Sequence, residues 1–309
     1  MIVVTATYRR PDGLADLLAS LRSEGSEVIG VVVVDNAGSA DTSVIVSRSP
    51  LPVHVITPGR NLGCGGGVAL GLREALRDPT VTHVAVFDDD AKAAPGVFRA
   101  MLDALQTSAA DAVTPLILNH AGYIGWFPGP LMQPAWSLVR EENVTPNQFR
   151  QACGNEPLDW VWSPWPSLLV TRRAVETVGF PRDDFWFQGE DIEWTTRISA
   201  RFRAVLAPAA EAWHLPPIGN SGNSFLKAAA MLQNNAFTAS RLAHGRRLLH
   251  TIPGNAWRFL RGHRFAGRAW SAAARAHWNG LVLGRPAGVA GADQFRLAWV
   301  RGLQSKREN

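Results

Sequence analysis

Residues 83–90 read His83-Val84-Ala85-Val86-Phe87-Asp88-Asp89-Asp90, an apolar run that ends in three carboxylates. The apolar part has the length and composition of a buried strand. Side chains alternate along extended backbone, so we expect Asp88 and Asp90 to point together while Asp89 points away. Two converging carboxylates suit a hard divalent cation such as Mg²⁺ or Mn²⁺. The alternative is a solvated acidic turn that caps the following helix.

On either side of this run, short β-branched segments alternate with helical patterns, which is typical of an α/β protein with a parallel sheet. In such a sheet, ligands bind beyond the carboxyl ends of the strands, and the aspartates occupy one of these ends. We predict strands at Ile2–Ala6, Val28–Val34, Val53–Thr57, His83–Phe87 and Ala112–Leu118, and helices at Asp12–Ser23, Gly66–Leu76 and Pro95–Gln106.

The pattern becomes less regular from Gly122 to Trp165, where Pro, Gly and Trp are frequent and irregular loops and short strands are expected. Further along we predict a strand at Ser167–Val170, helices at Arg172–Val178 and Glu190–Arg201, and a last strand at Phe202–Leu206. Beyond Phe225 the spacing is helical. One stripe there contains Trp270, Ala274, Trp278 and Leu281.

Charge divides the chain unevenly. Residues 225–309 contain 14 Lys and Arg against 2 acidic residues, a net charge of +12, whereas residues 1–224 have a net charge of −7. We therefore predict two regions, a main domain over 1–224 and a basic helical region over 225–309. The basic region suits phosphates, an anionic membrane surface or nucleic acid. Nucleic acid is disfavoured, because no recognition module is visible.

Composition narrows the class of protein further. The chain has only two cysteines, too few for a disulfide framework or a cysteine zinc site. No stretch approaches the roughly 18 apolar residues that span a bilayer, and the N-terminus lacks a signal peptide pattern. We expect a cytoplasmic protein.

Two further segments have the character of ligand sites. Asp35 and Asn36 follow the apolar run Val31–Val34, where Asp35 could accept hydrogen bonds from a base or ribose; a plain strand-to-loop turn is the favoured alternative. Gly59-Arg60-Asn61-Leu62-Gly63-Cys64-Gly65-Gly66-Gly67 precedes a helix and matches neither the Rossmann nor the Walker A pattern. Its glycines permit close approach of a ligand to the backbone, and the helix N-terminus favours anions.

Two later segments complete the set. Glu190, Asp191 and Glu193 lie within the aromatic stretch Phe185–Trp194, where apolar walls would make a carboxylate a better base; acidic residues in a first helical turn can also simply complement the helix dipole. His214 follows a strand and precedes two prolines, which suits a metal ligand, although a lone histidine is more often structural.

In this order and spacing, these elements resemble the inverting family 2 glycosyltransferases of the GT-A fold. The start Thr5-Ala6-Thr7-Tyr8-Arg9-Arg10 and the segment Ser167–Phe180 match as well, so the resemblance covers roughly residues 1–220. It implies a nucleotide-sugar half over about 1–120 and an acceptor half over about 121–224. The Trp213-His214-x-Pro element looks most like bacterial galactofuranosyl- and rhamnosyltransferases, and so suggests synthesis of a cell-envelope polysaccharide.

The resemblance also implies residue roles. Asp191 would be the catalytic base, with Glu190 as the alternative. Asp88, Asp90 and His214 would bind Mn²⁺ or Mg²⁺, and Asp88 and Asp89 would also lie beside the donor. Residues that would line or flank the nucleotide pocket are Thr5, Tyr8, Arg9, Asp35, Arg60, Asn61, Gly63 and Gly66. Trp160, Trp162, Trp165 and Trp186 would supply aromatic faces for the acceptor, with core packing as an equal alternative.

The implied reaction moves a sugar from a UDP- or dTDP-sugar to a hydroxyl of a carbohydrate, lipid-linked or small-molecule acceptor. The basic region would then contact the inner face of the plasma membrane, or only pack on the catalytic domain. Two rival functions are a sugar-phosphate nucleotidyltransferase and a non-catalytic sugar- or nucleotide-binding module. The first would need glycines directly after the first strand, where the chain has Tyr8-Arg9-Arg10-Pro11.

Overall fold

The computed structural model describes residues 1–24, 26–129, 131, 143–185, 188–216, 225–241, 256–257, 259–261 and 267–282. Two compact units can be distinguished. The first comprises 1–61, 67–181 and 194–221, and the second comprises 62–66, 182–193 and 222–309. The predicted boundary at 224 stays a prediction, but the second unit also includes the central glycines and the Glu190-Asp191 motif.

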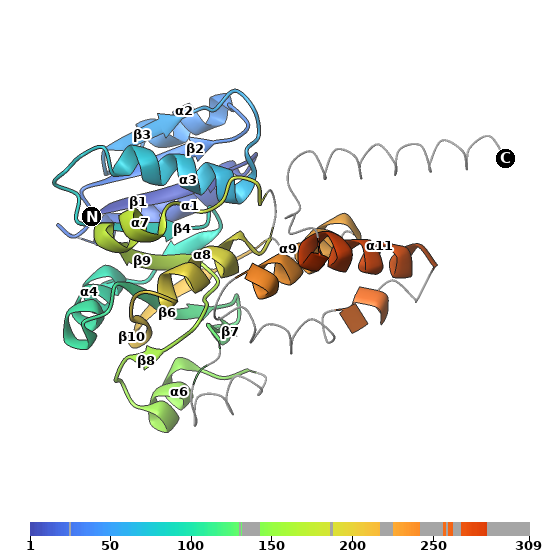
Figure 1. Cartoon of the computed structure of the whole chain (residues 1–309). Helices are drawn as coiled ribbons and strands as arrows, with labels where there is room; N and C mark the ends of the chain where they lie inside the picture. Colours follow the sequence, from blue (N-terminus) through green and yellow to red (C-terminus); the bar gives the residue numbers. More distant parts are fainter. Residues whose placement is uncertain are drawn as a thin grey trace. The chain divides into compact units, whose positions relative to one another are not determined.

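The first unit is built on one large sheet (Figure 1), whose main path runs β3-β2-β1-β4-β9-β6-β10-β5. Six strands run in the same direction: β1, β2, β3, β4, β6 and β10. Neighbours among them are parallel, except that β9 lies between β4 and β6 and is antiparallel to both. The six same-direction strands confirm the predicted mostly parallel α/β sheet. Their bounds are β1 Ile2–Thr7, β2 Gly30–Asp35, β3 Val53–Ile56, β4 His83–Phe87, β6 Ala112–Leu118 and β10 Ala204–His214; the others are β5 Ala91–Ala93, β7 Ile124–Trp126, β8 Leu158–Asp159 and β9 Ser167–Thr171.

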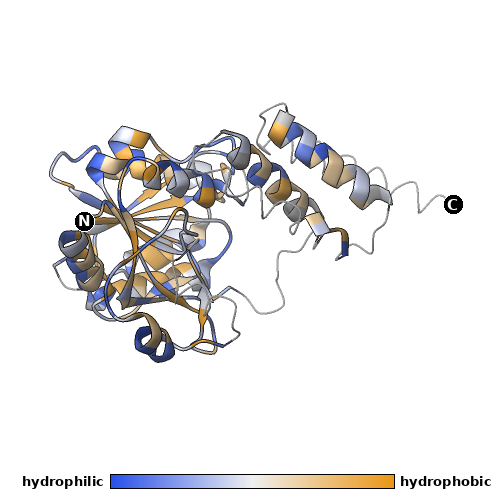
Figure 2. Ribbon diagram, turned by 60° about the horizontal axis from the view of Figure 1, so that its bottom comes forward, coloured by the Kyte–Doolittle hydropathy of each residue, from blue (hydrophilic) through white to orange (hydrophobic). Residues whose placement is uncertain are grey.

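Helices cover both faces of this sheet, as strands with apolar residues on both sides require. Helix α1 (Pro11–Ser20) packs Leu14 and Leu17 with Val3 and Val33. Helix α3 (Gly63–Ala75) covers the opposite face, to which the neighbouring strand residues Val4 and Val34 point. A Cβ on Gly71 would lie 2.5 Å from Val4 Cγ1. Figure 2 shows the strands coloured mainly as hydrophobic, with mixed colouring on the helices. The other helices of this unit are α2 Ala40–Ser47, α4 Val97–Ser108, α6 Pro146–Cys153, α7 Arg172–Val178 and, in its C-terminal part, α8 Glu190–Ser199.

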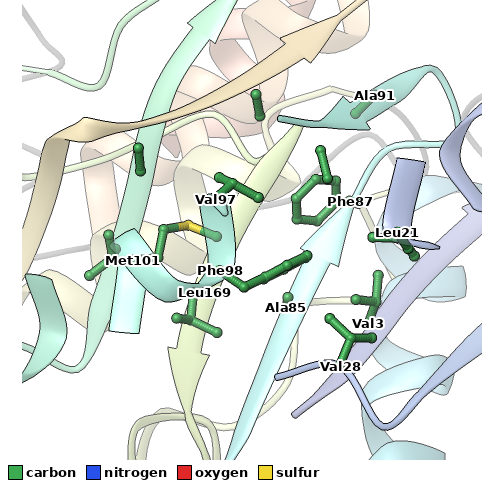
Figure 3. Packing of buried hydrophobic residues seen from close by; sticks show 14 of the residues in the cluster. Val3, Leu21, Val28, Ala85, Phe87, Ala91, Val97, Phe98, Met101 and Leu169 are labelled. Carbon is green, nitrogen blue, oxygen red and sulfur yellow. The ribbon is translucent and has the colours of Figure 1, made fainter. Parts of the chain in front are cut away.

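The core beneath the aspartate turn is aromatic. Phe87 from β4 and Phe98 from α4 are fully buried, and their ring centroids lie 5.4 Å apart. Figure 3 shows Met101 and Val97 on the same helix beside them. This packing fixes the end of β4, the strand from which Asp88–Asp90 continue.

Most of the predicted helices and strands are present in the structure at or near their predicted bounds. β4 and α7 have the predicted bounds, whereas β10 continues to His214 and does not end at Leu206. A bulge between Ala207 and Glu211 accommodates Pro208 and lets the strand continue past Leu206. α3 begins at Gly63, so most of the expected glycine loop is helical. α2, α6 and the short β5 were not predicted.

The second unit contains α9 (Phe225–Arg241), α11 (Gly267–His277) and one π-helical turn, Trp278–Val282. A small core joins them, formed by Ala229, Leu232, Phe259, Leu260, Ala269, Ala272, Ala273 and Ala276. Two residues of the predicted stripe, Trp270 of α11 and Trp278 of the π-helical turn, lie outside this core and are more than half exposed. Among the described residues, no helix combines the length and the apolar character needed to cross a membrane.

Candidate functional site

The site lies where parallel strands β1 and β4 end side by side, with Val4 paired to Val86. Beyond β4 the backbone does not stay extended. Asp88–Asp90 form a turn in which the Ala91 N–H donates to the Asp88 carbonyl at 3.0 Å, and β5 follows at once. The prediction that Asp88 and Asp90 converge is confirmed, but the turn produces the convergence, not strand alternation.

His214 completes a three-residue cluster with these carboxylates. Its Nε2 lies 3.0 Å from Asp90 Oδ1 and 3.8 Å from Asp88 Oδ2. One ligand atom from each of the three residues falls within 4.8 Å of the other two. The backbone maintains this contact, because His214 pairs with Ala91 across β10 and β5, and the Leu215 N–H donates to the Asp90 carbonyl at 2.8 Å.

Asp89 points away from the cluster and is buried. Its Oδ2 accepts a hydrogen bond from Thr7 Oγ1 at 2.7 Å, and its Oδ1 lies 3.4 Å from Arg10 Nη1. Burial raises the pKa of Asp89 to about 6, although both partners favour the ionised form. This carboxyl group ties β1 to the aspartate turn, which agrees with a structural role and not with the predicted donor contact.

The charges around the cluster are strongly coupled. Burial acts to raise the pKa of Asp90, but the hydrogen bond from His214 and the Arg10 guanidinium outweigh it and hold that pKa below its ordinary value. Burial acts to lower the pKa of His214, but the bond to Asp90 and the charge of Asp88 outweigh it and raise that pKa. A cation bound here would displace the His214 proton.

The donor set fits a divalent cation. Two carboxylate oxygens and one imidazole nitrogen are ligands that Mn²⁺ and Mg²⁺ sites use, with remaining positions left for phosphate oxygens or water. The three groups come from a turn and a strand end that packing fixes, so little rearrangement is needed to bring them together. The described residues thus offer a possible Asp-Asp-His metal site.

Two of the predicted nucleotide residues, Thr5 and Asp35, lie on β1 and β2. Thr5 is fully buried, so its side chain does not line a surface pocket. Both carboxylate oxygens of Asp35 already accept backbone N–H groups, from Ala37, Gly38 and Ser39 at 2.8–3.1 Å. Asp35 therefore stabilises its own turn, the alternative that the sequence favoured.

Other predicted nucleotide residues are more accessible. Tyr8 and Arg9 are exposed, and Arg9 has a φ of 56° with its guanidinium over the Tyr8 ring. Non-glycine residues rarely adopt such a φ, and strain of this kind concentrates at functional sites. Arg60 is exposed and Asn61 partly exposed. Their contacts with a nucleotide stay predictions.

In the second unit, the central glycines allow chain segments to pack closely. A Cβ on Gly65 would lie 2.9 Å from both the Arg182 and the Phe185 carbonyl oxygens, and one on Gly66 would lie 3.0 Å from Leu62 Cβ. Gly63 begins α3 with a φ of 75°. The need for glycine at 65 and 66 is thus explained by internal packing, without a ligand.

The Glu190-Asp191 motif begins α8 and follows a strained turn in the same unit. Gln188 and Gly189 both have positive φ, 56° and 92°. Asn234 of α9 is fully buried, and its Nδ2 donates to the Gln188 carbonyl at 2.6 Å. Burial raises the pKa of Asp191 to about 6, against the lowering effect of nearby backbone N–H groups. The C-terminal region therefore holds the segment that leads into Asp191.

The tryptophans predicted to meet the acceptor are mainly structural. Trp160 and Trp165 are buried, and Trp165 packs edge-on against Trp194 at 5.8 Å. Trp162 lies so close to Gly129 that a Cβ there would come within 2.5 Å of its ring. For Trp160 and Trp165, the structure therefore agrees with the alternative interpretation, core packing. Trp186 lies outside the described residues.

Sequence reasoning assigned no role to Thr7, Arg10 and Trp126, which contact the aspartate turn or His214. It also assigned none to Asn234, which in the second unit contacts the turn before Asp191. Thr7 ends β1 and Arg10 follows it, and the carboxyl end of β1 adjoins that of β4, so the parallel pairing could have indicated these two residues. Trp126 reaches His214, with ring centroids 4.3 Å apart, through the pairing of β7 with β6. No local pattern indicates that contact, or the one that Asn234 makes.

Comparisons with known proteins give a consistent result. The family model described as "Glycosyl transferase family 2" matches residues 2–158. Galactofuranosyltransferase GlfT1 of Mycobacterium tuberculosis is 27% identical over 224 residues, 71% of this chain and 71% of that protein. S. aureus TarS 1-349 in complex with UDP-GlcNAc has a TM-score of 0.63 at 17% identity, over 91% of this chain and 81% of that one. Mannosyltransferase PcManGT from Pyrobaculum calidifontis, in complex with GDP-Man and Mn²⁺, has a TM-score of 0.58 at 18% identity, over 98% and 80%. At such identities the two structures show the fold, the predicted GT-A arrangement.

Proposed function

Since this chain belongs to glycosyl transferase family 2, and is thus a glycosyltransferase, we propose that it transfers a sugar from a nucleoside-diphosphate donor to an acceptor hydroxyl with inversion. The observation that carries the proposal is the convergence of Asp88, Asp90 and His214 at the carboxyl end of the sheet. These residues would hold Mn²⁺ or Mg²⁺. A cation bound there supplies positive charge that offsets the charge developing on the leaving diphosphate.

Asp191 is the base in this proposal, and Glu190 is the alternative. A single displacement forms the bond from the acceptor oxygen to the anomeric carbon while the bond to the diphosphate breaks. The acceptor proton passes to the carboxylate, and no enzyme nucleophile is needed, so the configuration inverts. A pKa of about 6 supports this role, because Asp191 is ionised at neutral pH yet is a stronger base than an ordinary aspartate.

The donor in this proposal is a UDP- or dTDP-sugar. Two similar structures are described with UDP-GlcNAc and with GDP-Man and Mn²⁺, which supports a nucleotide-sugar in general. Exposed Tyr8, Arg9 and Arg60, together with Asn61, would contact the nucleotide, since cationic and aromatic side chains suit phosphates and bases.

The acceptor in this proposal is a saccharide on a lipid carrier at an anionic membrane surface. Trp257, Trp270 and Trp278 are each more than half exposed, and residues 225–309 have a net charge of +12. Exposed indole rings and cationic residues favour the headgroup region of a bilayer. Co-sedimentation with phosphatidylglycerol vesicles tests the contact, and the absence of binding at low salt would contradict it.

Two variants test the chemistry. Asp191→Asn should abolish transfer and leave donor affinity near that of the wild type, because the amide cannot take a proton. Asp90→Ala should instead lose Mn²⁺-dependent donor affinity in calorimetry. Full transfer by the first variant, or unchanged affinity in the second, contradicts the corresponding assignment.

One assay separates the proposal from its rivals. The protein is incubated with UDP-sugars, Mn²⁺ and a saccharide acceptor, and the products are measured. Release of UDP together with a glycosylated acceptor is expected. A nucleotidyltransferase would leave the acceptor unmodified and would form UTP and a sugar 1-phosphate only in a parallel reaction that also contains pyrophosphate. A binding module would release no product in either reaction.

A further inference from the structure

The Trp126 indole lies against the His214 imidazole. The ring centroids are 4.3 Å apart and the ring planes meet at 60°. Both residues end strands that flank the end of β6: Trp126 pairs with Ile117, and Trp213, the neighbour of His214, pairs with Leu118. Three strands of one sheet therefore fix where the two rings meet.

Hydrogen bonds leave the orientation of the His214 ring incompletely determined. In proteins, a metal-binding histidine usually donates its second ring N–H to a carboxylate or a carbonyl oxygen, which sets the ring rotation. His214 Nε2 faces Asp90 and Asp88, whereas its Nδ1 is buried and finds no hydrogen-bond partner among the described residues. The remaining restraint on the ring is steric.

The indole supplies that restraint. Only one aromatic ring is recorded against the imidazole in the described part of the chain, and a tilted contact at 4.3 Å limits rotation of the imidazole. The π face of an indole also favours a neighbouring group that carries positive charge, as an imidazole bound to a cation does.

We propose that Trp126 is a positioning residue, which holds the His214 imidazole with Nε2 toward Asp88 and Asp90 and so preorganises the metal site. The proposal rests on the proposed function, because cation binding is what makes the ring orientation matter. It assigns Trp126 no contact with either substrate.

The test is Mn²⁺ affinity of the full chain, measured from the electron paramagnetic resonance of free Mn²⁺. Trp126→Ala should weaken binding by about 10-fold or more, the loss typical when the residue behind a metal ligand is removed. Trp126→Phe keeps a ring at this position and should restore most of the affinity. Phe127→Ala is the matched control, because the Phe127 ring packs against Phe149 at 5.9 Å and its loss should not change affinity.

A double variant separates positioning from general damage. In a His214→Ala background, Trp126→Ala should cause no further loss, since the ring that it positions is gone. An equal further loss in that background, or wild-type affinity in Trp126→Ala alone, would overturn the proposal.

A second measurement does not depend on the metal. In protein labelled with ¹³C-histidine, the His214 ring resonance should shift in Trp126→Ala and stay unchanged in Phe127→Ala. If the wild type binds no Mn²⁺, the metal assignment fails, and the claim that Trp126 preorganises the metal site fails with it. If the His214 resonance is unchanged in Trp126→Ala, only the positioning role of Trp126 is refuted.

Discussion

The raised pKa of Asp191 predicts a pH dependence that an ordinary aspartate would not give. With a pKa of about 6, about nine-tenths of the carboxyl groups are ionised at pH 7 and about one-tenth at pH 5. Transfer at subsaturating acceptor should therefore fall roughly ninefold between these values. An aspartate with the ordinary pKa of 3.8 would stay more than about nine-tenths ionised across this range and give a flat profile.

The measurement is kcat/KM for the acceptor from pH 4.5 to 8, with Mn²⁺ and donor saturating at every point. Asp89 is a confounding group, because burial also raises its pKa to about 6. Thr7→Val separates the two. It removes the 2.7 Å hydrogen bond that stabilises ionised Asp89, so it raises the pKa of Asp89 and leaves that of Asp191 unchanged. A flat profile, or an inflection that moves upward in Thr7→Val, refutes the assignment of Asp191 as the base.

The same pKa has a consequence for stability. The folded pKa of Asp191 lies above the unfolded value, so its favourable contribution is complete below pH 3.8 and is lost as pH rises through about 6. Asp191→Asn should therefore raise the Tm at pH 7.5 but change it little at pH 4. A lower Tm at pH 7.5 would show that burial does not penalise the charge.

Three further predictions concern packing and positioning. Gly71→Ala should destabilise the fold by about 1–2 kcal/mol in urea unfolding, because the new Cβ would lie 2.5 Å from Val4 Cγ1 and overpacking outweighs the better helix propensity of alanine. Gly267→Ala is the control, because the space around Gly267 is open. Equal stability of the two variants contradicts the packing argument. Trp165→Ala should lose about 3–5 kcal/mol by the same assay while its acceptor KM stays unchanged at a permissive temperature, since the ring is buried against Trp194; a raised KM without loss of stability would restore its acceptor role. Asn234→Ala frees the Gln188 carbonyl and should lower kcat by roughly 10-fold with donor affinity unchanged, and wild-type kcat would exclude a positioning role for Asn234.

Local sequence was sufficient to predict the bounds of elements whose structure depends mainly on residues nearby in the chain. The apolar run ending at Phe87 predicted β4 to the residue, and Arg172–Val178 predicted α7. Local sequence gave the wrong bounds where contacts with distant parts of the chain decide where an element begins or ends. The strand was predicted to end at Leu206, but a bulge around Pro208 allows β10 to reach His214. The glycines before Val68 were expected to let a ligand approach the backbone, but α3 already begins at Gly63, and Gly65 and Gly66 pack closely against other chain segments.

The residue types and their order along the chain, Asp88-Asp89-Asp90, then Glu190-Asp191, then Trp213-His214, were enough to indicate the fold class and the family, because both depend on patterns that repeat in sequence. Three features depended on contacts between residues far apart in the sequence: which carboxylates face His214, which tryptophans are buried, and what holds the strained turn before Asp191. The hydrogen bond between Thr7 and Asp89 is a further contact of this kind. Such contacts follow from strand pairing and burial, which no local run of residues encodes. The aspartate turn combines both sources: sequence located it, and folding set Asp88 and Asp90 toward His214 and Asp89 toward Thr7.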